Sequence, residues 1–172
     1  MYVSTYGRIE LQVDLADGAD FELFGANIGT GLSTNEIVTN VRHLEPNGRS
    51  RQVVRSVLNG KAIGTYLGKI EVARGAQKSD AEQSVKAMLL DRGATANAKP
   101  ELEIFADDVK CAHGATVGEL DSDQLFYLGS RGLPPAKARA LLLEGFVMGL
   151  WDRVSEPDAI CEAAREALRR TV

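Results

Sequence analysis

Residues Lys99–Gly132 read KPELEIFADDVKCAHGATVGELDSDQLFYLGSRG, and within them the sequence changes from a strand-like to a helical pattern. Between Val109 and Val117 every second residue falls on one side of an extended chain. Cys111 and His113 lie on that side, about 7 Å apart along the backbone by the rise of a strand. Because a thiolate and an imidazole both bind transition metals, these two side chains form a candidate metal site.

The helical pattern begins at Asp121, because Gln124 follows three residues later in the spacing of a capping box. Pro135 suits the first turn of a second helix, and Ser155 with Asp158 has the spacing of another capping box. The last helix has a thin, alanine-rich apolar stripe, so we expect it to pack weakly or fray. The sequence therefore predicts three helices: Asp121–Gly129, Pro135–Val154 and Pro157–Arg170.

Upstream of these helices, short apolar or alternating runs are separated by Gly, Asn and Asp. Such runs are typical of β-strands, and their periodicity alone leaves a sandwich, a barrel and a solenoid open. We expect strands over Arg8–Leu15, Phe21–Ala26, Glu36–Leu44, Gln52–Leu58, Ala62–Leu67, Lys69–Ala73, Ser84–Leu90, Glu101–Phe105 and Val109–His113.

The composition excludes several classes of protein. Acidic and basic residues are interspersed over 172 residues with a formal net charge of −4, which argues against nucleic-acid binding. The N-terminus lacks the pattern of a signal peptide, and no apolar run is long enough to span a membrane. Two cysteines are too few for a disulfide framework, so we expect a cytoplasmic protein.

The stretch quoted above contains KPELEI, ADDVKC and HGATVG, followed by QLFYL and SRG. In this order the segments resemble the C-terminal pattern of the SufB/SufD family, the scaffold proteins of the SUF iron–sulfur cluster assembly machinery. CAHGAT at residues 111–116 is similar to the SufD type, because SufB-type chains have Glu-His-Glu-Ala-Thr there. Upstream segments such as QKSDAEQS at residues 77–84 extend the resemblance over about Arg8–Trp151.

The resemblance implies a right-handed parallel β-helix over residues 1–120 and a small helical domain over residues 121–172. Family members are usually longer, so we interpret this sequence as the C-terminal part of such a protein. It implies a non-catalytic scaffold that pairs with a SufB-type protein and docks a SufC-type ATPase. The helical region would carry the ATPase contact, and our candidates are Leu125, Phe126, Tyr127, Arg131 and Phe146.

For His113 and Cys111 the resemblance implies a place near the SufB–SufD interface, where nascent clusters are assembled. The alternative interpretation is that both side chains fill the interior of the β-helix. Clusters usually take about four protein ligands, so this chain would hold a metal or cluster only transiently and shared with a partner.

The family complex has been linked to a reduced flavin, for which the sequence contains no motif. Without SufB we expect the chain to form a homodimer through a two-fold contact.

A different class of protein also fits the predicted fold: a β-solenoid enzyme that acts on carbohydrates. Asp107 and Asp108 would be its acid–base pair, but neighbours in a strand point to opposite faces and would not share one substrate.

Two further residues have structural interpretations. We expect His43 to be a packing residue at a strand end and Cys161, outside the matched segments, to have no role in function.

Overall fold

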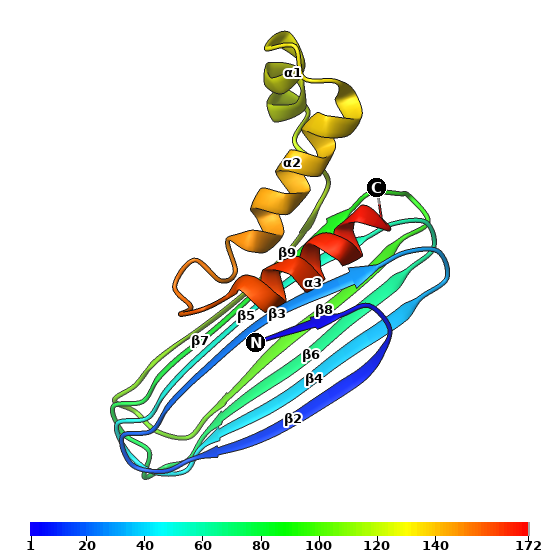
Figure 1. The fold of residues 1–172 in the computed structure, drawn as a ribbon. Helices are drawn as coiled ribbons and strands as arrows, with labels where there is room; N and C mark the ends of the chain where they lie inside the picture. The colour runs from blue at the N-terminus through cyan, green and yellow to red at the C-terminus, as the bar shows by residue number, and fades with distance from the viewer. Residues whose placement is uncertain (172) are drawn as a thin grey trace.

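The strands coil into a parallel β-helix, drawn in Figure 1, in which each coil contributes one strand to each of two sheets. The computed structural model describes residues 1–171. One sheet has the order β1-β3-β5-β7-β9 and the other the order β2-β4-β6-β8, and all pairs are parallel. The strands are β1 Tyr2–Ser4, β2 Gly7–Leu15, β3 Asp20–Gly29, β4 Thr34–His43, β5 Arg49–Leu58, β6 Ile63–Val72, β7 Asp80–Leu89, β8 Thr95–Ile104 and β9 Lys110–Gly118.

Alternation along each strand places one set of side chains inside the coil. On β4 and β6 they include apolar residues such as Ile37, Val41 and Ile70 and polar residues such as Asn35 and Thr39, all at most 2% exposed. Turns between the strands use left-handed residues at the expected positions, with φ of 67° at Gly18 and 60° at Asn47. The expected parallel β-helix is therefore confirmed.

Most strand boundaries differ from the sequence-based ones, and the largest difference is at β8, which begins at Thr95 rather than Glu101. The predicted strands Ala62–Leu67 and Lys69–Ala73 are one strand, β6, which runs through Gly68. A Cβ atom at Gly68 would lie 2.3 Å from the hydroxyl oxygen of Tyr66, so this glycine makes room for a buried ring. The short strand β1 was not predicted, and it pairs with β3.

Three helices follow β9: α1 Ser122–Ser130, α2 Pro135–Met148 and α3 Asp158–Arg169. The predicted cap of α1 is confirmed, because the Asp121 carboxylate accepts from the main-chain N–H groups of Asp123 and Gln124. The end predicted for α2 was wrong, since the helix stops at Gly149. The cap predicted at Ser155 was also wrong, because Pro157 precedes α3 without a side-chain cap.

Helices α2 and α3 pack on the outer face of the β1-β3-β5-β7-β9 sheet, and α3 lies along it in Figure 1. The expectation that α3 docks weakly was wrong. Its alanines allow close approach, so that the buried cluster joins residues of α2 and α3 to the outer side chains of β3 and β5. The buried members of this cluster are Phe24, Ala26, Ile28, Val57, Leu143, Val147, Leu150, Trp151, Ala164, Ala167 and Leu168.

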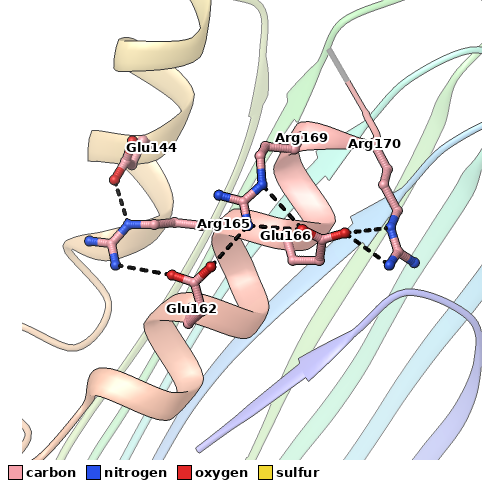
Figure 2. A network of polar contacts seen from close by, with 6 residues as sticks. All are labelled: Glu144, Glu162, Arg165, Glu166, Arg169 and Arg170. Atoms are coloured by element: carbon pink, nitrogen blue, oxygen red, sulfur yellow. Dashed lines mark hydrogen bonds and ion pairs between the residues drawn. The ribbon is translucent and has the colours of Figure 1, made fainter.

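The exposed side of α3 carries a network of ion pairs, shown in Figure 2. Arg165 reaches Glu144 of α2 at 2.7 Å and therefore joins the two helices. Glu166 of α3 pairs with Arg169 at 2.8 Å and with Arg170, the residue that follows the helix, at 3.0 Å. Exposed pairs contribute little each, so the buried cluster beneath them fixes the position of α3. In residues 1–171 no helix is long and apolar enough to cross a membrane.

Candidate functional site

The candidate site lies at the end of the β-helix formed by β8 and β9. Each of these strands is the last in its sheet within residues 1–171, so their free edges and inner side chains are uncovered. The side chain of Val117, which would face the interior of a longer coil, is 48% exposed. Ile104 and Phe105 at the end of β8 are also exposed. The site is therefore an apolar, open coil end with unpaired strand edges.

Cys111 and His113 both face the inner side of this open end, as the alternation predicted. The structure gives them different surroundings. Cys111 is half-buried against the interior cluster that includes Ala81 and Ala106. Burial raises the pKa of its thiol, the nearby Asp80 carboxylate raises it further, and a main-chain hydrogen bond with Ala81 opposes the shift. The sulfur is therefore held mainly as a thiol, which is a weaker metal ligand than a thiolate.

His113 is exposed, and it stands at the end of an interior column of side chains. The residues that precede it in register are Leu23 on β3, Gln52 on β5 and Gln83 on β7. All three are buried, whereas His113 has no coil above it in the described part of the chain. The imidazole is thus accessible at the open end of the coil.

The pair cannot form a complete metal site by itself. Among residues 1–171 no group of three or more His, Cys, Asp or Glu side chains is positioned to hold a metal ion. Cys111 and His113 could supply two ligands at most, so any cluster at this place would need the remaining ligands from another molecule.

The candidate contact residues of the helical region fall into two groups. Helix α1 projects away from the β-helix in Figure 1, and it has no buried residue. Its Phe126 and Tyr127 are 79% and 56% exposed, and the Arg131 guanidinium lies 5.3 Å from the centre of the Tyr127 ring. Leu125 is only partly exposed and lines a groove between α1, α2 and β7.

Phe146 has a different environment from the α1 residues. It is half-buried against the cluster between helices and sheet, and the guanidinium of Arg55 lies 5.4 Å from the centre of its ring. Its packing therefore fixes α2 on the sheet and leaves only part of the ring on the surface.

The residues considered for a carbohydrate-active enzyme are Asp107 and Asp108. Both lie in the turn between β8 and β9, as the predicted strand ends allow, so the expectation that they point to opposite faces of one strand does not apply to them. The main-chain N–H of Asp108 donates to the side-chain oxygen of Gln77, and its carbonyl accepts from the N–H of Lys78. These contacts give the Asp108 backbone a structural role in joining successive turns.

Of the remaining candidates, His43 is fully buried, with Nε2 2.8 Å from the Ser50 hydroxyl, in agreement with a packing role. Cys161 is partly buried beside the cluster under α3.

Sequence reasoning missed Gln83 and Arg55. Gln83 stands two positions beyond Ala81 on the inner face of a strand, and a glutamine at such a position in the alternating pattern is a signal that could have been read.

Comparisons with known proteins agree with the resemblance. A family model described as SUF system FeS cluster assembly, SufBD core domain, matches residues 3–146. The chain is 37% identical over 125 residues to the iron–sulfur cluster assembly protein SufD of Escherichia coli, covering 71% of this chain and 30% of that protein. It is 35% identical over 133 residues to an iron–sulfur cluster assembly SufBD family protein of Synechocystis, covering 77% of this chain and 29% of that protein.

A plant relative adds a third comparison. The chain is 42% identical over 104 residues to the chloroplastic protein ABCI7 of Arabidopsis thaliana, covering 59% of this chain and 22% of that protein. The sequence thus spans less than a third of the length of these three relatives. Because the family model covers most of the β-helix and extends into α2, the chain belongs to the SufBD core domain family of the SUF iron–sulfur cluster assembly system.

Proposed function

We propose that this chain acts as a non-catalytic, SufD-type scaffold in SUF iron–sulfur cluster assembly. The observation that carries the proposal is the open end of the β-helix, where an exposed histidine stands beside unpaired strand edges and apolar side chains. A SufB-type protein of the same fold would cover this end. The family membership and the name of the Escherichia coli relative support this assignment.

The strand edges give the pairing a physical basis. The outer edge of β9 offers main-chain N–H and C=O groups with which a strand of another molecule can pair. Val117 and Phe105 are exposed at the same end and would be buried by such a partner. Burial of apolar area contributes roughly 25 cal/mol per Å², so covering these side chains favours association.

At this interface His113 would be a ligand or a proton-transfer group for the iron–sulfur cluster, the substrate of the assembly. An imidazole replaces a thiolate in some protein-bound clusters. Cys111 would have a secondary role, because burial raises the pKa of its thiol. The cluster would therefore be held transiently, with its other ligands from the partner.

The helical region would dock a SufC-type ATPase through α1. Phe126 and Tyr127 are exposed on a helix that has no fully buried residue, and Arg131 stacks on the Tyr127 ring. Aromatic and arginine side chains are enriched among the residues that dominate binding energy at protein interfaces. Phe146 would contribute indirectly, by holding α2 on the sheet.

Co-purification with tagged SufB-type and SufC-type proteins tests these partner assignments separately. The variant Val117→Lys places a charge at the open end, so we expect loss of the SufB-type partner with the SufC-type partner retained. Phe126→Ala with Tyr127→Ala has the opposite expectation. Retention of both partners by both variants would contradict the proposed surfaces. Failure of the wild-type chain to bind either partner would contradict the proposed function.

A further inference from the structure

Several polar side chains are buried in the interior of the β-helix, and one group of them forms a polar seam that ends at His113. We use this name for Thr39, Tyr66, Gln52 and Gln83, all of which are at most 2% exposed. The Tyr66 hydroxyl donates to the side-chain oxygen of Gln52 at 3.2 Å and lies 3.1 Å from the Thr39 hydroxyl. Burial raises the pKa of Tyr66 to about 12, so the hydroxyl remains a donor at neutral pH.

The last two members of the seam have unused hydrogen-bonding groups. The side-chain nitrogen of Gln52 and both polar atoms of the Gln83 amide are buried without a partner. A buried amide without hydrogen bonds costs free energy, so we expect these atoms to have a further hydrogen-bond partner. Ordered water or a movement of a neighbouring polar side chain would satisfy them.

His113 is the polar neighbour that stands next in the column. Gln83 on β7 and His113 on β9 are register partners in adjacent parallel strands, which lie about 4.8 Å apart. Their side chains leave the sheet on the same side, because Ala81 and Cys111, two residues earlier on each strand, pack in one interior cluster. An amide and an imidazole at this separation can share a hydrogen bond directly or through one water molecule.

We propose that Gln83 is the positioning residue of His113, with its side-chain amide hydrogen-bonded to the imidazole directly or through a single water. The bond fixes the orientation of the ring and determines which ring nitrogen carries the proton. The other nitrogen then faces the open end of the coil. This inference deepens the proposed function, on which it rests only for the role of His113 in cluster assembly.

Histidine NMR on the isotope-labelled full chain provides a direct test, because the protein has only two histidines. His43 is an internal reference, because its ring is hydrogen-bonded to Ser50 and is not part of the column that contains Gln83. We expect the His113 ring-nitrogen shifts in the wild type to differ from those of a free histidine side chain at the same pH. In Gln83→Met, a variant of similar shape without the amide, they move to the free values while those of His43 stay unchanged.

Gln52→Met is the matched control, because it removes the same group one coil further from His113. We expect it to leave the His113 shifts at their wild-type values. Equal shifts in Gln83→Met and wild type, or equal effects of the two variants, would overturn the proposal. If Gln83→Met does not fold, the wild-type spectrum still decides, since free-histidine shifts for His113 would overturn it.

This measurement is independent of the proposed function, because it is made on the chain without partners or iron. Cluster assembly by the Gln83→Met complex then separates the two claims. If the His113 ring-nitrogen shifts move to the free values in Gln83→Met and the assembly rate also falls, both claims are supported. Displaced shifts with an unchanged rate support the positioning of His113 and contradict its role in assembly.

Discussion

Arg55 on β5 donates a hydrogen bond to the main-chain carbonyl oxygen of Phe146 on α2, and its guanidinium carbon lies 5.4 Å from the centre of that ring. A Cβ atom at Gly149 would lie 2.9 Å from the Nη1 atom of Arg55, so the glycine at the end of α2 leaves space for the arginine. Burial lowers the pKa of Arg55, and the attraction of Asp152 opposes the shift. This contact ties the C-terminal half of α2 to the outer face of the β-helix.

Replacing Arg55 by Ala removes this contact, and we expect the free energy of unfolding to fall by about 1–3 kcal/mol. Hydrogen bonds from charged groups and the stacked side chain both contribute to that range. Urea denaturation measures the loss. The control is Arg8→Ala, which removes an exposed arginine from an ion pair with Glu36 and is expected to cost less than about 1 kcal/mol. Equal effects of the two variants would contradict the role given to Arg55.

The docking of α3 is tested by Leu168→Ala. Leu168 is buried against the outer face of the sheet, so we expect a loss of about 2–5 kcal/mol in the free energy of unfolding. Leu141→Ala is the matched control on α2, because the Leu141 side chain is 51% exposed. Hydrogen exchange locates the effect: amides of α3 lose protection first in Leu168→Ala. A loss no larger than that of Leu141→Ala would mean that α3 does not depend on this cluster.

The acid sensitivity of the fold is expected to depend on His43. Burial lowers the pKa of this imidazole, so protonation favours the unfolded chain. The stabilising contribution is complete above the unfolded pKa of about 6.5 and is lost as the pH falls through the lower folded pKa. Urea midpoints at pH 7.5 and 5.0 measure the difference. His43→Leu is expected to reduce this difference, so equal pH dependence in wild type and His43→Leu would contradict the assignment.

Much of the fold could be predicted from sequence, because alternation in strands such as β4 and the cap at Asp121 are local features. The meeting of Arg55 with Phe146 could not, since it joins residues 91 positions apart and depends on how α2 crosses the sheet. The candidate site was predicted only in part, because only its local features can be read from the sequence. Cys111 and His113 share a face by local periodicity, whereas Gln83 comes beside His113 only through the register of β7 and β9.

Self-association is expected for the chain without partners. The open end of the β-helix exposes Val117 and the edge of β9, and a second copy could cover both through a two-fold contact. A stable interface would bury more than about 1,000 Å² in total. Sedimentation velocity at micromolar concentration is expected to show a dimer for wild type and a monomer for Val117→Lys. A strictly monomeric wild type would refute the expectation.

Anaerobic reconstitution of the complex with SufB-type and SufC-type partners tests the central claim most directly. The compared chains are wild type, His113→Ala and Thr116→Ala; Thr116 lies on the same strand with its side chain on the opposite face. His113 is exposed, so its replacement is expected to change the free energy of unfolding by less than about 0.5 kcal/mol. We expect His113→Ala to bind both partners and to assemble clusters more slowly than wild type and Thr116→Ala. Assembly at the wild-type rate by His113→Ala would contradict the account.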